Sequence, residues 1–374
     1  MSSANADKRP AVVVIGGGYA GYSAAKALDE FADVSLIEPR DAFVHNVAAL
    51  RALVDPEWLS RIFLPYDRLL ANGRVVRDRA VAVEPGRVTL ASGAELSAEV
   101  IVLATGSTYP YPAKTGTDET ATAVARYRES HEQLANAGRV LIVGAGPTGL
   151  ELAGEISDRW PDKRITILEP EPEILAGEYK QELRDEIRRQ LEARGVEFVL
   201  GDPPTAEPGI PPVTYGSVSV STGAGRQIDA DIWFRCYGLA PVSDYLRGEL
   251  AGALRLDGSI DVTPTLQVEG QTHVFAIGDV SSADLKTAGR AGREADVAVA
   301  NIRALLHGDE LQAYEPSPPA IVIPLGPSGG ASELPGQDEI AGAETTAAIK
   351  GEHMFIDMYR ERFGLIEPAA AASS

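Results

Sequence analysis

Two short glycine motifs in this sequence have the residue types and the spacing of a phosphate-binding loop. They read Gly16-Gly17-Gly18-Tyr19-Ala20-Gly21 and Gly144-Ala145-Gly146-Pro147-Thr148-Gly149, and each directly follows a run of apolar, β-branched residues. In such a loop the first glycine makes a tight turn, the second lets the backbone approach a pyrophosphate, and the third allows close contact between helix and strand. The pyrophosphate then lies at the N-terminus of the helix. Two motifs therefore predict two bound dinucleotides.

Each motif is followed by an acidic residue that could bind a ribose diol. Glu38 lies 38 − 16 = 22 residues beyond Gly16, and Glu169 lies 169 − 144 = 25 residues beyond Gly144. Both distances are near the spacing of about 20 residues of a dinucleotide fold. A carboxylate at Glu169 would also face the extra phosphate of NADPH, and two like charges about 4 Å apart cost roughly 1 to 4 kcal/mol. We therefore expect NADH to be preferred, with NADPH as an alternative.

The elements that must position these residues follow from hydrophobic periodicity. Strands are predicted at residues 11–15, 34–37, 100–104, 139–143, 165–168 and 272–277, and helices at 22–31, 121–137, 150–160, 178–194 and 287–306. Alternating strands and helices predict an α/β fold with parallel sheets. We expect two Rossmann-like dinucleotide-binding domains and a small C-terminal α+β extension. Two such domains in one chain favour a flavoprotein that also binds NAD(P)H.

Composition excludes several classes of function. The chain has 374 residues and a formal net charge of -20, which would repel a phosphate backbone, so no nucleic-acid partner is expected. Its single cysteine, Cys236, excludes a disulfide, a Cys-x-x-Cys pair or a cysteine-ligated metal within one chain, and no metal site is expected. Cys236 ends an apolar run and is expected to be a small buried hydrophobe. The polar segment Met1 to Pro10 predicts a disordered leader on a cytoplasmic protein.

Five further stretches are distinctive: residues 41–51 (DAFVHNVAALR), 103–108 (LATGST), 257–279, 297–302 and 311–314. With these stretches the chain resembles the two-dinucleotide-binding FAD oxidoreductases. Within that group it is most similar to the ferroptosis-suppressor or apoptosis-inducing-factor-like NAD(P)H:quinone oxidoreductases, which are related to type II NADH dehydrogenases. The resemblance covers nearly the whole chain. It implies FAD in the first domain, NAD(P)H in the second, and transfer of two electrons to a quinone.

The same resemblance implies a discontinuous first domain. We expect the FAD-binding domain at residues 10–110 and 258–312, the NAD(P)H-binding domain at 111–257, and a dimerisation or substrate-cap region at 313–374. A homodimer and a peripheral contact with a membrane both stay open. Phe355, Tyr359 and Phe363 share one face of a helix-like segment, and this face would belong to a core or dimer contact, or to a cap over an apolar substrate site.

The motifs and the resemblance together name the expected cofactor-binding residues. Those expected to hold FAD are Gly16, Gly18, Tyr19, Ala20, Gly21, Glu38, Arg40, His45, Asn46, Ala104, Thr105, Gly106, Asp279, Lys286, Thr287 and Ala288. Those expected to hold NAD(P)H are Gly144, Gly146, Pro147, Thr148, Gly149, Glu151, Glu169 and Gly238.

Three residues are candidates for a catalytic role. His45 could give a proton to the reduced quinone, pack against the flavin, or be structural. Lys286 could add positive charge where a helix N-terminus meets the reduced flavin, or be a solvated lysine. Glu151 could face the nicotinamide, or serve only as an acidic residue near a helix N-terminus.

Two other functions share both motifs. One is a ferredoxin or rubredoxin reductase, which would need a basic docking patch, for which the scattered arginines from Arg51 to Arg79 are the available residues. The other is an NADH-sensing flavoprotein of the apoptosis-inducing-factor type. A disulfide reductase is excluded because the chain has one cysteine.

Overall fold

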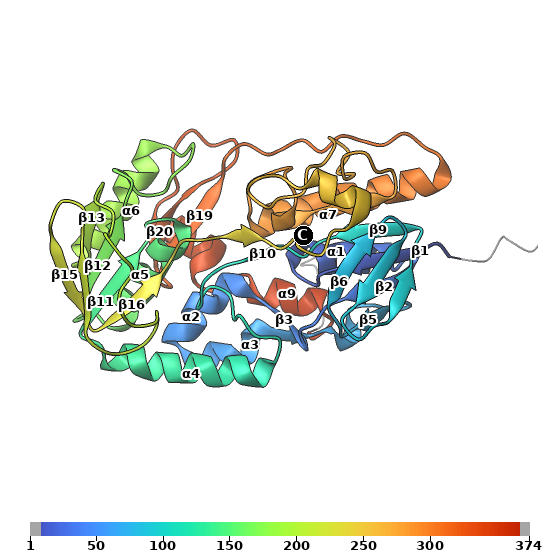
Figure 1. Ribbon diagram of the computed structural model, residues 1–374. Coiled ribbons are helices and arrows are strands. Elements are labelled where there is room, and N and C mark those ends of the chain that lie inside the picture. The colour runs from blue at the N-terminus through green and yellow to red at the C-terminus, as the bar shows by residue number, and fades with distance from the viewer. Residues whose placement is uncertain (1–8, 367–374) are drawn as a thin grey trace, which may run out of the picture.

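The two glycine motifs follow strands of two separate parallel sheets, and these sheets form the centres of the two halves of the molecule (Figure 1). The computed structural model describes residues 9–366, so the predicted N-terminal leader falls almost wholly outside the described residues. The first sheet has the order β18-β9-β1-β2-β5, with β1 Ala11–Ile15, β2 Asp33–Ile37, β5 Arg74–Val76, β9 Val100–Leu103 and β18 Val274–Ala276. The second has the order β13-β12-β11-β16, with β11 Arg139–Val143, β12 Arg164–Glu169, β13 Glu197–Leu200 and β16 Ile232–Arg235.

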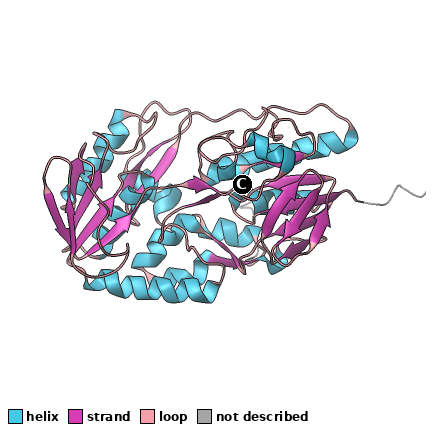
Figure 2. Ribbon diagram, in the orientation of Figure 1, coloured by secondary structure: helices cyan, strands magenta, loops and turns pink. Residues whose placement is uncertain are grey.

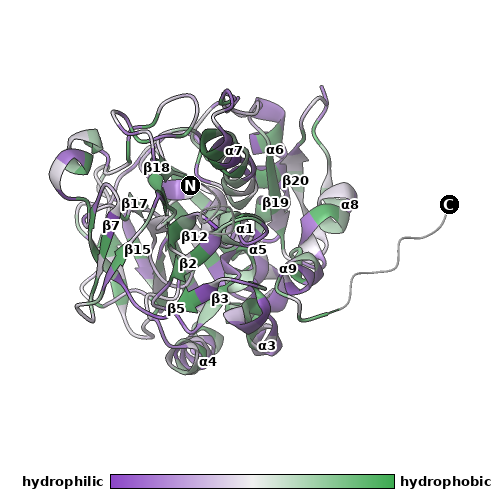
Figure 3. Cartoon of the chain, turned by 90° about the vertical axis from the view of Figure 1, so that its right-hand side faces the viewer, coloured by the Kyte–Doolittle hydropathy of each residue, from purple (hydrophilic) through white to green (hydrophobic). Residues whose placement is uncertain are grey.

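Burial on both faces explains why these strands are continuous apolar runs. Along β1, Val12 and Val14 pack on the side of the helices, whereas Val13 and Ile15 pack on the opposite side. Parallel sheets are covered on both faces, so their strands do not alternate between apolar and polar residues. Figure 3 shows apolar residues along β2 and β18. Strand β18 follows the strands of the second sheet in the sequence but pairs with β9 of the first sheet. The first sheet is therefore built from two separate stretches of the chain.

The helices are α1 Tyr19–Leu28, α2 Ala49–Val54, α3 Leu59–Ile62, α4 Thr120–Asn136, α5 Pro147–Arg159, α6 Gln181–Ala193, α7 Ala288–His307, α8 Ala343–Thr346 and α9 Ile356–Arg362. The five ranges predicted from periodicity correspond to α1, α4, α5, α6 and α7, and two of these helices begin three residues early. Helix α1 was expected from residue 22 and α5 from residue 150. Both begin within the glycine motif itself, because Gly18 and Gly146 occupy the N-cap positions and Pro147 suits the first helical position.

Short antiparallel pieces connect and extend the two halves (Figure 2). They are β3 Ala42–Val44 with β4 Phe63–Pro65, β6 Ala80–Glu84 with β7 Arg87–Leu90 and β8 Glu95–Ser97, β10 Ser107–Thr108 with β17 Ala240–Pro241, β14 Val218–Ser221 with β15 Gln227–Ala230, and β19 Ile321–Leu325 with β20 Gly329–Glu333. The β10–β17 pair joins the two segments that cross between the halves.

The C-terminal region contacts both halves of the molecule. The β19–β20 hairpin packs on α5 and α6 of the second half, and a π-helical turn, Ala347–Gly351, leads to α9 beside the first half. Tyr359 of α9 and Phe363, which follows it, are buried against Tyr22 and Phe43, with ring centroids 4.9 to 6.3 Å apart. The aromatic face of this segment therefore belongs to the core of its own chain. Within residues 9–366, no helix is both long enough and apolar enough to cross a bilayer.

Candidate active site

A cavity lies between the two halves, where the carboxyl ends of β1, β9 and β18 meet the N-terminus of α5. Crevices at the carboxyl ends of parallel strands are the usual ligand sites of such sheets. The predicted residues that line it are Gly16, Gly18, Tyr19, Ala20, Glu38, Arg40, Asn46, Ala104, Thr105, Gly106, Asp279, Lys286, Thr287, Ala288, Pro147, Thr148 and Glu151. The predicted residues outside its lining are Gly21, His45, Gly144, Gly146, Gly149, Glu169 and Gly238.

The first glycine loop has the geometry that a pyrophosphate site needs. Gly16 has a φ of +97°, and a side chain there would come within 2.4 Å of the Ala104 carbonyl oxygen. A Cβ on Gly21 would lie 1.7 Å from the carbonyl oxygen of Gly16, so this glycine lets the helix contact the strand. At Gly18 a Cβ would meet no described atom within 4 Å, because this position opens toward the cavity. The loop is thus closely packed against the end of β9 and open toward the cavity.

The second loop repeats this geometry. Gly144 has a φ of +109°, and a Cβ there would lie 2.6 Å from the Cys236 carbonyl oxygen. A Cβ on Gly149 would lie 2.0 Å from the Gly144 carbonyl oxygen, whereas one on Gly146 would meet no described atom within 4 Å. Two loops of the same shape, each at the N-terminus of a helix, fit the pyrophosphates of two dinucleotides. Cys236 is buried beneath the second loop, and burial raises the pKa of its thiol to about 12.

The two predicted ribose-binding acids are joined to the glycine loops. Glu38 accepts hydrogen bonds from the backbone N–H groups of Gly17 (2.6 Å) and Arg40 (2.9 Å). Glu169 accepts from those of Ala145 (2.6 Å) and Glu171 (3.1 Å). Each carboxylate therefore lies at the end of its strand beside the loop. A carboxylate has about four lone-pair sites, so acceptor capacity for a ribose remains.

Asp279 is held by two residues that the sequence analysis did not single out for this role. Ser107 Oγ donates to Asp279 Oδ2 at 2.5 Å, and Lys114 Nζ lies 3.5 Å from the same oxygen. Lys114 Nζ also donates to Ser107 Oγ at 2.8 Å, and burial lowers the pKa of this ammonium. All three side chains line the cavity. They form a polar group at the end of β9 and β18 that suits the hydroxyls of a bound cofactor.

Helix α7 directs its N-terminus into the cavity. Lys286, Thr287, Ala288 and Ala291 line it, and the Thr287 side chain caps the helix by accepting from the Arg290 N–H. The Lys286 ammonium donates to the Ser281 carbonyl oxygen at 3.1 Å. A helix N-terminus with a lysine beside it favours negative charge on the bound group. The start of α7 thus lines the cavity, and its predicted place beside the flavin stays a prediction.

Lys350 is a cavity residue that the sequence analysis missed. Its Nζ donates to Glu151 Oε1 at 2.7 Å, and each of the two side chains is 13% exposed. Burial raises the pKa of the Glu151 carboxyl, and the Lys350 charge opposes this shift. No sequence signal pointed to Lys350, because 199 residues separate the two partners. The C-terminal region thus contributes a charged side chain to the cavity.

A second ion pair lies behind this one. Arg51 Nε donates to Glu155 Oε2 at 2.5 Å, and Arg51 Nη2 donates to the Gly351 carbonyl oxygen at 2.9 Å. Both side chains are almost fully buried. Arg51 therefore ties α2, α5 and the π-helical turn together beside Lys350. Glu155 thus serves as the buried ion-pair partner of Arg51.

His45 lies next to the cavity-lining Asn46 but does not itself line the cavity. Its side chain is 0% exposed, and burial lowers its pKa to about 4. One ring nitrogen, Nδ1, lies 3.1 Å from the Tyr19 hydroxyl, and the other, Nε2, lies 2.6 Å from the Met354 carbonyl oxygen. This geometry does not favour the predicted transfer of a proton from His45 to a substrate.

Comparison with known proteins places the chain among flavoenzymes. A profile described as pyridine nucleotide-disulphide oxidoreductase matches residues 10–299. The chain belongs to this family. Apoptosis-inducing factor homolog B from Dictyostelium discoideum is 30% identical over 369 residues, which cover 93% of this chain and 95% of that protein. Ferroptosis suppressor protein 1 from Homo sapiens is 30% identical over 335 residues, which cover 87% and 88%.

Solved structures support the same fold. The sulfide:quinone oxidoreductase from Aquifex aeolicus superposes with a TM-score of 0.74 at 17% sequence identity, over 96% of this chain and 92% of that one. The predicted α/β fold with two Rossmann-like domains is confirmed. The chain is an FAD-dependent oxidoreductase that uses NAD(P)H as co-substrate. Its cavity fits FAD, because the first glycine loop is open toward it and Glu38, Asp279 and the start of α7 surround it.

Proposed function

We propose that this enzyme passes two electrons from NADH, through FAD, to a quinone. The observation that carries this proposal is the Lys350–Glu151 pair. It lies beside apolar residues in a cavity that is lined by both halves and by the C-terminal region. Val47, Leu50 and Leu239 line the same cavity, so an apolar ring has a wall to pack against. The family relationship and the resemblance of residues 41–51 support the same acceptor class.

Reduction of a quinone by NADH also consumes one proton. When bound, FAD would supply the hydride chemistry, since it can accept two electrons and one proton from the nicotinamide and pass the same two electrons and one proton to the acceptor. The remaining proton must reach a quinone oxygen from the protein or from water. Lys350 Nζ carries protons at the cavity wall, and Glu151 holds the ammonium in place through their 2.7 Å hydrogen bond. We assign the proton-donating role to Lys350 and the orienting role to Glu151.

Lys350→Ala tests this assignment. We expect it to slow quinone-dependent NADH oxidation by about 10²-fold, the low end of what general acid catalysis contributes. FAD content should stay near wild type, whereas thermal stability should fall because Glu151 loses the partner of a largely buried ion pair. Lys163→Ala is the matched control, since Lys163 bonds backbone oxygens at the end of α4 and not the cavity. Wild-type turnover in Lys350→Ala would refute the assignment.

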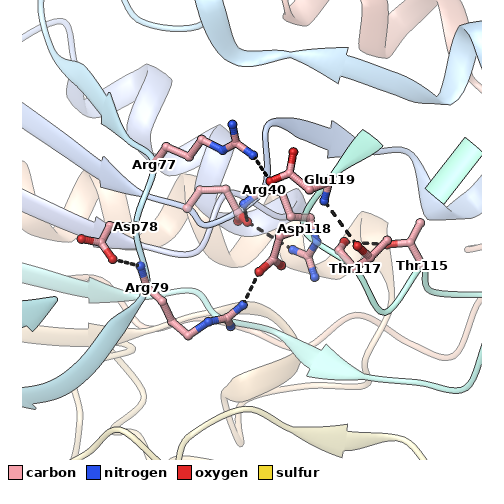
Figure 4. Close-up of polar contacts among 9 residues, drawn as sticks. Arg40, Arg77, Asp78, Arg79, Thr115, Thr117, Asp118 and Glu119 are labelled. Carbon is pink, nitrogen blue, oxygen red and sulfur yellow. Dashed lines mark hydrogen bonds and ion pairs between the residues drawn. The ribbon is translucent and has the colours of Figure 1, made fainter. Parts of the chain in front are cut away.

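A protein electron acceptor is less well supported by this surface. Arg51 is buried in an ion pair, and Arg77 and Arg79 are paired with Glu119 and Asp118 (Figure 4). Three of the six arginines between positions 51 and 79 thus lie beside acidic partners that offset their charge, whereas Arg61, Arg68 and Arg74 are exposed. A ferredoxin-type partner would have to dock on these three arginines.

The preference for NADH rests on Glu169, whose carboxylate lies at the end of β12 beside the second glycine loop. A 2′-phosphate in that place would meet like charge.

The NADH-sensing alternative predicts flavin reduction with slow turnover for every acceptor. The expected domain boundaries, cytoplasmic location, homodimer and peripheral membrane contact stay predictions.

A further inference from the structure

His45 belongs to a buried chain of hydrogen bonds. The Val47 N–H donates to the Tyr19 hydroxyl at 3.1 Å, and that hydroxyl lies 3.1 Å from His45 Nδ1. His45 Nε2 lies 2.6 Å from the Met354 carbonyl oxygen. A carbonyl oxygen can only accept, so Nε2 carries the ring proton and Nδ1 accepts from Tyr19. Burial raises the pKa of Tyr19 well above its ordinary value, which keeps this donor protonated.

This series of hydrogen bonds ends at Met354, where the backbone has an unfavourable conformation. Met354 and Phe355 have φ angles of +48° and +57° and are consecutive non-glycine residues in the left-handed region. Side chains rarely adopt this region, and it persists only where the surroundings hold it. Phe355 N–H donates to His353 Nδ1 at 3.0 Å, and Met354 is 2% exposed. The His45 donor fixes the Met354 carbonyl oxygen from the opposite side of the turn.

This turn is joined directly to Lys350. The Met354 N–H donates to the Lys350 carbonyl oxygen at 2.7 Å, while Lys350 Nζ reaches Glu151 at the cavity. The ring of Tyr359, in the helix that follows the turn, lies 4.4 Å from the His45 ring between centroids. His45 thus contacts the C-terminal segment through a backbone carbonyl and a packed ring. Movement of the turn would move the backbone from which the Lys350 side chain extends.

We propose that His45 is a positioning residue, which holds the Met354–Phe355 turn and thereby keeps Lys350 Nζ in place against Glu151. This inference rests on the proposed function of Lys350. It replaces the proton-donor role predicted for His45 with a hydrogen-bonding one. The ring itself exchanges no proton with the substrate, because both nitrogens already have partners within the chain.

Two substitutions separate these roles. The amide nitrogen of His45→Gln can take the place of Nε2 and donate to Met354, whereas the shorter side chain of His45→Asn reaches only the place of Nδ1. We expect His45→Gln to keep quinone-dependent turnover within about three-fold of wild type. We expect His45→Asn to lose about 10- to 100-fold in kcat with little change in KM, as a small misplacement of a catalytic group does.

A double-mutant cycle with Lys350→Ala identifies the residue through which His45 acts. If His45 acts through Lys350, His45→Asn should not slow Lys350→Ala any further. An equal further loss in both backgrounds would overturn the proposal. A folded, FAD-loaded His45→Gln enzyme without turnover would overturn it as well, because that variant keeps the hydrogen bond to the Met354 carbonyl oxygen by which His45 is proposed to hold the turn.

Amide hydrogen exchange supplies a readout independent of activity. Exchange at residues 350–356 should increase in His45→Asn and stay at the wild-type level in His45→Gln, with α7 unchanged in both. Equal exchange in the two variants would overturn the proposal. If the wild-type enzyme failed to reduce any quinone, the proposed function would fall, while a difference in exchange would still show that His45 holds the turn.

Discussion

Glu294 shows at the scale of one residue how burial sets the chemistry of this molecule. It lies on α7, is 2% exposed, and accepts a hydrogen bond from the Gly278 N–H at 2.8 Å. Burial raises the pKa of its carboxyl to about 7, opposed by the Gly278 bond and Lys286 and reinforced by Asp284 and Asp279. Gly278 lines the cavity, so this acid lies directly behind the cofactor site.

The raised pKa makes stability depend on pH in a definite direction. An unfolded glutamate loses its proton near 4.5 and the folded one near 7, so between these values the folded state binds more protons and stability falls as pH rises. We predict that Glu294→Gln, which keeps an acceptor for Gly278, is more stable than wild type at pH 8 by up to ~3 kcal/mol. The two should be nearly equal at pH 4.

Urea unfolding at both pH values measures this difference. Glu344→Gln is the control, because Glu344 is exposed and its substitution should change stability by less than about 0.5 kcal/mol at either pH. Equal stability of wild type and Glu294→Gln at pH 8 would show that folding does not raise the pKa of Glu294.

At the scale of elements, the sequence predicts what local patterns determine. Strands β1 and β11 have the predicted bounds, because apolar β-branched runs before a glycine motif leave little choice of register. Helices α1 and α5 begin three residues early, since amphipathic periodicity says nothing about the first turn formed by the motif. The β19–β20 hairpin was not predicted, because its contacts with α5 and α6 are entirely tertiary.

Gly154 decides how closely that hairpin packs on α5. A Cβ there would lie 2.4 Å from Leu325 Cα, in the backbone of β19. We predict that Gly154→Ala destabilises the protein by about 1–3 kcal/mol, the usual cost of overpacking. Gly292→Ala is the matched control in α7, where a Cβ meets no described atom within 4 Å. It should stabilise by about 0.5–1 kcal/mol through helix propensity.

Thermal unfolding of the two alanine variants tests this contrast. Opposite shifts in Tm are expected. A loss of stability in Gly292→Ala equal to that in Gly154→Ala would mean that the close contact with Leu325 does not limit the packing.

At the scale of the whole molecule, the C-terminal region completes the site by contacting both halves. The first glycine loop, Glu38, Asp279 and the start of α7 could be predicted to converge, because the carboxyl ends of parallel strands meet at one edge. Lys350 could not, since its place depends on the hairpin, the π-helical turn and the Met354–Phe355 turn together. His45 was predicted to bind FAD or donate a proton, but it lies behind the cavity lining, because the folded tail around Met354 buries it.

Electron transfer from NADH through the bound flavin to a quinone can be followed under anaerobic conditions. The FAD-loaded protein is mixed with one equivalent of NADH, its flavin absorbance is followed, and a short-chain ubiquinone is then added. We predict rapid loss of absorbance with NADH and rapid, complete recovery with the quinone. Loss of absorbance without recovery on adding quinone would show that the reduced flavin does not pass its electrons to a quinone, and it would favour a protein acceptor or an NADH-sensing role.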